Sequence, residues 1–177
     1  MNQPGSSHEA TSPQGYGPPG GSLQQPKPAK TASTLGIVSG ALGIASALLT
    51  LALTAGLQSE LNKLQGRARP DLFAQAMALV NMTYALAVAM IVAGVILLVG
   101  GIQFRGGKGY ALLRAGAIAQ ILVVAADLLL TFSVSGTLNT APNAGSFLRV
   151  VVGLGLAIAI LTNLSKPETK QWKDSVS

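Results

Sequence analysis

The chain has 177 residues, of which 49% are hydrophobic and only 10% are charged, and its formal net charge is +6. Because a soluble domain carries about 25% charged residues, this composition excludes an ordinary water-facing surface and favours lipid as the solvent. The sequence has no cysteine and a single histidine, His8, which argues against disulfides, thiolate chemistry and a bound metal or cofactor.

The N-terminal segment, residues 1–33, is dense in proline, glycine, serine and glutamine. Such a composition buries too little apolar surface to offset the entropy of ordering, so we expect a disordered Pro/Gly-rich tail. A flexible tether is the simpler interpretation, and a docking segment around Tyr16 in the stiff polyproline conformation is the alternative. The apolar run that follows begins too late for a secretory signal peptide and should be retained as a membrane span.

Four apolar runs follow the tail, and each is long enough to cross about 30 Å of hydrocarbon. They predict an all-α integral membrane protein with a disordered N-terminal tail. Its transmembrane domain, residues 34–164, is expected to be a four-helix bundle with spans at residues 34–57, 78–102, 111–134 and 147–164.

Short polar segments connect and follow these spans. Residues 58–77 place apolar residues at helical spacing on both sides of Pro70, which predicts an external linker of amphipathic helices on the membrane surface. Residues 103–110 predict a tight helical hairpin turn. Their GGKG segment is no phosphate loop, because Gly109 stands where serine or threonine is required. Residues 135–146 predict an uncharged loop, and residues 165–177 a polar tail with Trp172 at the membrane interface.

Lysine and arginine are unequally distributed between the two sides of the predicted bundle. If the N-terminus is cytoplasmic, four cations lie outside and eight lie inside, namely Lys27, Lys30, Arg105, Lys108, Arg114, Lys166, Lys170 and Lys173. This bias predicts a multi-pass protein of the plasma (inner) membrane with both termini cytoplasmic. The cations form no stripe with interleaved aromatics, so membrane lipid and not nucleic acid is the expected partner.

One face of the first span consists of small residues at steps of three and four, namely Gly36, Gly40, Gly43, Ala47, Thr50 and Thr54. This is the period of a left-handed coiled coil. Membrane helices associate through such small residues, because lipid supplies no hydrophobic drive. The seam predicts a close helix–helix contact. We favour a partner helix within the same bundle, and another protein is the alternative.

The third and fourth spans carry the polar residues of the predicted interior. Gln120, Asp127 and Thr131 share one face, which should point inward because a carboxylate facing lipid is costly. Arg149 lies near the outer end of the fourth span, and we predict an intramembrane Asp127–Arg149 ion pair. Asn81 of the second span is assigned to the polar interior as well. The favoured role of the pair is to fix helix register. A proton or ion site is one alternative, and Arg149 reaching to the headgroups is the other.

The tail and first span also carry a likeness to known proteins. Residues 13–21 (PQGYGPPGG) lead into residues 36–45 (GIVSGALGIA). This arrangement resembles small actinobacterial four-span membrane proteins of uncharacterised function that have a Gly/Pro/Gln-rich cytoplasmic tail. The resemblance implies the same topology, and it transfers neither a function nor a site residue.

The sequence offers no constellation for catalysis, which needs a nucleophile, base or metal together with its partners. Short loops, a small-residue seam and a flexible tail favour a non-catalytic accessory or scaffold subunit of a bacterial membrane protein complex of the envelope, division or respiratory machinery. Its expected partners are other membrane proteins or a second copy of the chain. The alternative is a small oligomeric transporter or channel that uses Asp127 and Arg149, although the spans lack the internal prolines typical of transporters.

Overall fold

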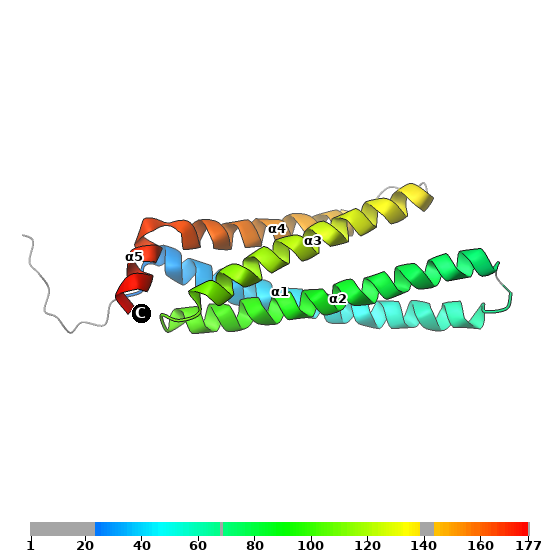
Figure 1. Ribbon diagram of the computed structural model, residues 1–177, viewed down its shortest axis with the longest axis horizontal. Helices are drawn as coiled ribbons and strands as arrows, with labels where there is room; N and C mark the ends of the chain where they lie inside the picture. The colour runs from blue at the N-terminus through cyan, green and yellow to red at the C-terminus, as the bar shows by residue number, and fades with distance from the viewer. Residues whose placement is uncertain (1–23, 68, 139–143, 177) are drawn as a thin grey trace, which may run out of the picture.

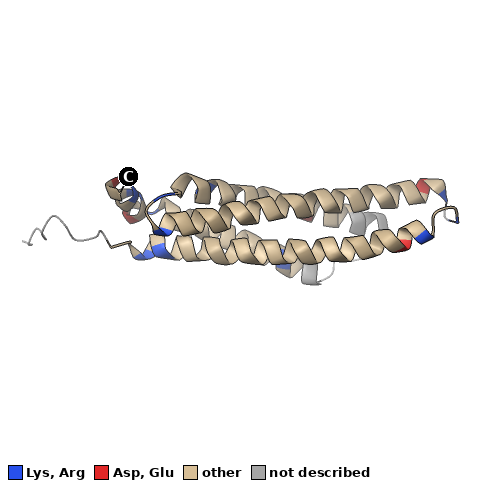
Figure 2. Cartoon of the chain, turned by 90° about the horizontal axis from the view of Figure 1, so that it is seen from below, with Lys and Arg blue, Asp and Glu red and all other residues tan. Residues whose placement is uncertain are grey.

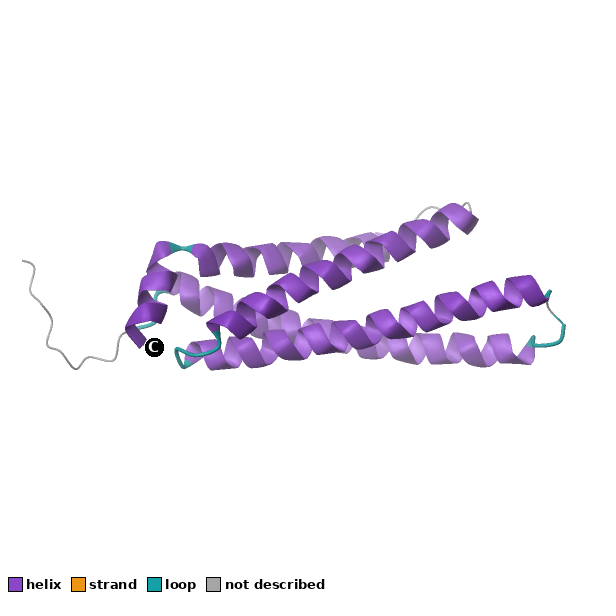
Figure 3. Cartoon of the chain, viewed as in Figure 1, coloured by secondary structure: helices purple, strands orange, loops and turns teal. Residues whose placement is uncertain are grey.

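The computed structural model describes residues 24–67, 69–138 and 144–176. The predicted tail up to residue 23 and residues 139–143 of the predicted loop lie outside the described residues. Within the described part, all regular structure is α-helical (Figures 1 and 3), and the helices in chain order are α1 (Lys27–Lys63), α2 (Pro70–Arg105), α3 (Tyr110–Leu138), α4 (Ala144–Ser165) and α5 (Pro167–Val176).

Four of these helices are long and apolar enough to cross a membrane, which confirms the predicted all-helical fold with four candidate spans. In Figure 1, α1 and α2 form one antiparallel hairpin, α3 and α4 form a second, and α5 lies beside the start of α1. We call this the α5 end and the opposite end the distal end. Figure 2 shows most charged residues at these two ends, with long uncharged stretches of helix between them.

Prolines mark where three of the helices begin. Pro28 lies in the first turn of α1, and Pro70 and Pro167 are the first residues of α2 and α5. Proline suits this position because the first turn leaves its backbone N–H groups unpaired and proline has none. Residues 27–33, which we predicted as part of the disordered tail, are therefore helical. Ala29 and Ala32 explain the difference, because both are fully buried in the bundle.

The predicted surface linker at residues 58–77 is also wrong. α1 continues unbroken to Lys63 and α2 starts at Pro70, so only residues 64–69 connect them, with Gly66 at a φ of 87°. The apolar spacing that suggested helices on the membrane surface belongs to the ends of two long antiparallel helices. Tyr84 Oη of α2 donates a hydrogen bond to Gln58 Oε1 of α1 at 3.0 Å, which ties these ends together.

The connection between α2 and α3 is the tight turn that the sequence predicts. Gly107 and Gly109 adopt φ values of 81° and 80°, in the left-handed region that glycine enters without steric cost. Lys108 N donates to Gln103 O at 3.1 Å and closes the turn. Gly109 has a second reason to be glycine, because a Cβ there would lie 2.7 Å from Cβ of Gln103. The turn places α3 directly beside α2.

The small-residue seam of α1 packs against α2, so its partner lies within the bundle as we favoured. The contact is made by backbone atoms. A Cβ on Gly40 would lie 2.5 Å from the Gly94 carbonyl oxygen, and one on Gly94 would lie 2.9 Å from the Gly40 oxygen. Farther toward the α5 end, a Cβ on Gly101 would lie 2.8 Å from the Ser33 oxygen. Five seam positions are buried, and Thr50 is half-buried.

The tightest side-chain packing lies at the α5 end. Phe104, Leu113 and Leu164 are almost completely buried there, and Trp172 of α5 meets the Phe104 ring edge-on at a centroid distance of 5.5 Å. Residues 165–177 were predicted as a polar tail, yet residues 167–176 form a helix that covers this end of the bundle. Thr169 Oγ1 donates to the Asn163 carbonyl oxygen at 2.9 Å and fixes the bend between α4 and α5.

Candidate functional site

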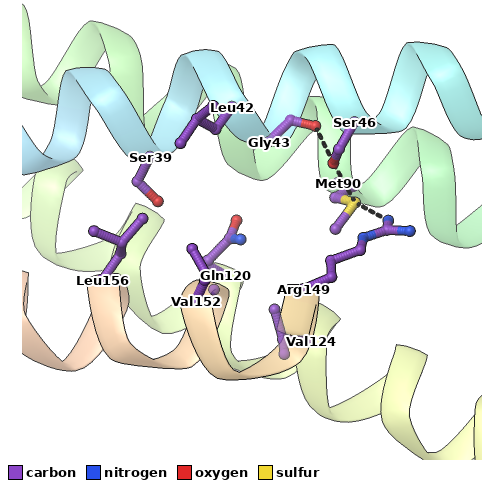
Figure 4. A pocket seen from close by; sticks show the side chains of 11 residues that line it. Ser39, Leu42, Gly43, Ser46, Met90, Gln120, Val124, Arg149, Val152 and Leu156 are labelled. Atoms are coloured by element: carbon purple, nitrogen blue, oxygen red, sulfur yellow. Dashed lines mark hydrogen bonds between the residues drawn. The ribbon is translucent and has the colours of Figure 1, made fainter. Parts of the chain in front are cut away.

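A cavity of about 210 Å³ lies among the four long helices (Figure 4). It lies about halfway along the bundle and takes side chains from every long helix. Its lining is mostly apolar, with four polar side chains among it. The lining residues are Ser39, Leu42, Gly43, Ser46, Met90, Gln120, Val124, Arg149, Val152, Gly153 and Leu156.

Gln120 projects from α3 into the cavity toward α1 (Figure 4). Its side chain is 4% exposed, and its Oε1 is buried with no hydrogen-bond partner among the described residues. The sequence placed Gln120 in the polar interior, and its burial confirms this. A buried acceptor with no partner is costly, so native proteins rarely keep one without a reason such as a bound molecule.

Arg149 extends from α4 across the cavity toward α1 and α2 (Figure 4). One guanidinium nitrogen lies 2.8 Å from Met90 Sδ, and the other terminal nitrogen lies 3.4 Å from Thr50 Oγ1. Thioether sulfur is a weak acceptor and carries no charge. Arg149 Nε is buried without a partner in the described part of the chain. The guanidinium charge is therefore only weakly compensated.

The predicted Asp127–Arg149 ion pair is not formed, and this is a correction to the sequence prediction. The salt bridges between described residues are Glu60–Lys63, Arg69–Asp71 and Lys173–Asp174. A difference in depth along the bundle is not what separates Arg149 from Asp127. Gly153 packs on Val124, and Arg149 is one turn from Gly153, so Arg149 lies at about the level of Asp127. What differs is direction, because Arg149 is turned toward Thr50 and Met90.

Asp127, Thr131 and Asn81 do not line the cavity. Asp127 and Thr131 are half-buried, and Thr131 Oγ1 donates to the Asp127 carbonyl oxygen of its own helix at 2.8 Å. Asn81 is exposed on α2, so its assignment to the polar interior is wrong. The helical period explains this, because the neighbouring Val80 takes the buried position.

Ser39, Ser46 and Met90 are among the cavity residues that sequence reasoning missed. Ser39 is buried, while Ser46 Oγ donates to the Gly43 carbonyl oxygen at 3.2 Å and contacts Met90 Sδ at 3.8 Å. The two serines are seven residues apart, which places them on one face of α1 beside the glycine seam. That spacing was a signal for a second, polar stripe. Nothing in the sequence singles out Met90 as a contact of an arginine.

The cavity opens sideways between α1 and α4. Leu42 of α1 and Val152 of α4 both line it, yet they are 54% and 45% exposed on the surface of the bundle. Both residues belong to helices that are long and apolar enough to span a membrane. They form an apolar mouth of the cavity at the surface of the bundle.

The cavity holds no recognisable catalytic machinery. Its titratable side chain is Arg149, and no cluster of three metal-binding side chains occurs among the residues that the structure describes. Comparisons with known protein families, with curated proteins and with solved structures find no match.

Proposed function

We propose that this protein is a non-catalytic accessory or scaffold subunit of a bacterial membrane protein complex. In this proposal both termini are cytoplasmic, the membrane is the plasma membrane, and the distal end faces outward, as the distribution of cations in the sequence favours. The observation that carries the proposal is the distal end of the α1–α2 hairpin. This end of the hairpin exposes apolar side chains, and in the proposal it lies outside the hydrocarbon of the membrane.

The length of α1 and α2 supports a position of the distal hairpin outside the hydrocarbon. The two helices contain 37 and 36 residues. At about 1.5 Å per residue each is about 55 Å long, against a hydrocarbon thickness of about 30 Å. The charged residues at the tip of the hairpin, including the Glu60–Lys63 and Arg69–Asp71 pairs, fix it in water or at the headgroups.

Leucines are exposed among these charges. Leu64 is 49% exposed and lies closer to the tip of the hairpin than Glu60. Leu72 is 53% exposed and follows Asp71 directly. Exposed apolar residues with a polar rim are typical of protein–protein contacts. A hairpin that projects from the membrane with such a surface suits docking onto the outward-facing part of a larger membrane protein. The short connection of residues 64–69 leaves no room for a separate soluble domain.

The transporter alternative has weaker support. It needs Asp127 and Arg149 on one pathway, and Arg149 contacts Thr50 and Met90 instead. The resemblance to actinobacterial four-span proteins stays a prediction, as does the assignment of the complex to the envelope, division or respiratory machinery.

The experiment places a photo-crosslinking amino acid at position 64 of the full chain in intact bacterial membranes. We expect one discrete crosslinked species, and we expect the same species to co-purify in mild detergent. Replacing Leu64 and Leu72 together by alanine should remove the co-purified partner at unchanged abundance. The matched control is Leu122→Ala, which removes the same side chain from a lipid-facing position of α3. Recovery of an isolated chain, or equal loss in the Leu122 control, would contradict the proposal.

A further inference from the structure

We infer that the cavity between α1 and α4 binds the head of an anionic amphiphile. Its phosphate or carboxylate would lie against Arg149, and its hydrocarbon chain would leave through the apolar mouth into the bilayer. This inference does not depend on the proposed accessory function, because it rests on the cavity and not on the distal α1–α2 hairpin. Three observations carry it, namely an unneutralised cation, an unpartnered acceptor, and the size and direction of the cavity.

The charge of Arg149 requires an anion. An arginine inside a membrane protein is normally paired or placed in water, because the bare charge is costly in hydrocarbon. Within the described ranges Arg149 has no carboxylate partner, and its guanidinium contacts a thioether sulfur and a hydroxyl. Arginine presents a planar fork that binds phosphate or carboxylate with two parallel hydrogen bonds. Arg149 lines the cavity, and its Nε, which has no partner among the described residues, is one arm of that fork.

The buried amide of Gln120 requires a donor. Its Oε1 is inside the cavity and has no partner in the described part of the protein. A hydroxyl on the head of the amphiphile, such as that of a glycerol group, would supply the missing hydrogen bond. Ser39 and Ser46 place two further hydroxyl groups on the α1 wall of the cavity, where they face Gln120 and Arg149 (Figure 4). Four polar side chains thus lie within the mostly apolar lining, where the head would contact them.

The dimensions of the cavity favour a head and not a whole ligand. Sites for complete small molecules measure about 300–1,000 Å³, and this cavity measures about 210 Å³. The rest of the occupant must therefore lie outside. Because Leu42 and Val152 form an apolar mouth that opens on the lipid-facing surface, the outside portion is expected to be a hydrocarbon chain. A soluble anion would have to cross that apolar mouth.

Native mass spectrometry of the full chain released from detergent micelles tests the inference with four probes. Dioleoylphosphatidylglycerol and oleate supply an anionic head on a chain, dioleoylglycerol supplies the chain alone, and inorganic phosphate supplies the anion alone. We expect one molecule of either anionic amphiphile per chain and no comparable binding of the other two probes. Equal binding of dioleoylglycerol would overturn the proposed role of the charge, and equally tight binding of phosphate would overturn the role of the amphiphile.

Variants then locate the binding. Arg149→Gln should weaken binding about tenfold or more, because a hydrogen bond to a charged group is lost. The control is Arg114→Gln, which removes an exposed arginine of α3 and should leave binding unchanged. Equal effects of the two variants would overturn the inference.

A second variant is informative even if Arg149→Gln fails to fold. A Cβ on Gly43 would meet its nearest neighbours, Gln120 Oε1 and Gly94 Cα, at 3.9 Å, so a side chain begins there without a clash. Gly43→Leu should extend into the cavity and abolish binding of the anionic amphiphile while the chain remains folded. Unchanged binding by a folded Gly43→Leu chain would place the ligand elsewhere and overturn the inference.

Discussion

The two ends of the bundle are built from the same kinds of apolar side chain and use them differently. At the α5 end Phe104 is fully buried, whereas at the distal end Phe132 of α3 is 55% exposed. The distribution of glycine explains the contrast. Gly100 and Gly101 of α2 and Gly116 of α3 all lie near the α5 end, and a Cβ at any of them would approach a neighbouring helix within about 3 Å. Figure 1 shows the α3–α4 hairpin diverging from the α1–α2 hairpin toward the distal end.

This difference assigns separate roles to the two ends. Close backbone approach at the α5 end holds the helices in register, because a packed interior has few ways to rearrange. The distal end leaves its apolar side chains to lipid or to a partner. The cavity lies between these two ends, where small residues such as Gly43 and Gly153 form part of its wall.

The largest expected effect comes from truncating the aromatic contact at the α5 end. Phe104→Ala removes a ring that touches both Trp172 and Tyr110 and leaves a cavity. We expect a loss of about 3 kcal/mol in the free energy of unfolding. The measurement is reversible unfolding of the full chain in mixed detergent micelles.

Phe132→Ala is the matched control at the distal end. It removes the same ring from an exposed position of α3 and should change the free energy of unfolding by less than about 0.5 kcal/mol. Similar losses for the two phenylalanine variants would show that the ends are equally packed, and the comparison would then fail.

A smaller effect is expected from adding one methyl group to the seam. In Gly40→Ala the new Cβ would lie 2.5 Å from the Gly94 oxygen and 2.8 Å from the Leu98 nitrogen, both backbone atoms. Since backbone cannot rotate away, α1 and α2 must move apart, at a cost of about 1–3 kcal/mol. Gly56→Ala is the control, because a Cβ there meets nothing within 4 Å. The same unfolding measurement compares the two variants. If Gly40→Ala were as stable as Gly56→Ala, α1 and α2 would be able to move apart without cost.

The smallest effect concerns pH at the α5 end. The Asp174 carboxylate accepts a hydrogen bond from Lys173 Nζ at 2.9 Å and raises the pKa of Lys173 above its ordinary 10.5. A raised pKa means that the stabilisation is complete below pH 10.5 and is lost as the pH rises through the folded-state pKa. The free energy of unfolding, measured below and above that pH, should be slightly lower on the alkaline side. Asp174→Asn should abolish the loss, and an equal loss in that variant would assign it to another group.

Much of the fold could be predicted because membrane spans and small-residue seams are local patterns. The seam from Gly36 to Thr54 predicted a close contact from spacing alone, and its glycines meet Gly94 and Gly101 of the next helix. The extent of the helices was less predictable. Charges between residues 58 and 77 resemble a linker when read locally, whereas pairing between antiparallel helices, as in the Tyr84–Gln58 hydrogen bond, keeps both helices intact.

The site was only partly predictable, because it depends on the rotation of one helix relative to three others. Burial of Gln120 follows from its position on one helical face of α3. The depth of Arg149 along α4 does not determine which helix its side chain meets. Successive residues of a helix point about 100° apart around its axis, so the rotation of α4 decides whether Arg149 faces α3 or faces α1 and α2. Ordering of α5 depends on contacts with residues distant in the sequence, such as those of Trp172 with Phe104 and of Lys173 with Tyr110, which no local pattern encodes.

The unequal lengths of the helices have a consequence for the membrane itself. α4 has 22 residues and is about 33 Å long, close to the thickness of the hydrocarbon core of an average bilayer. In a thicker bilayer α4 would have to thin the surrounding lipid or draw its polar ends inward, whereas the longer α1 and α2 would not. Arg149 lies five residues from the start of α4 and would be the first charge drawn inward. A change in bilayer thickness would then change the environment of this arginine.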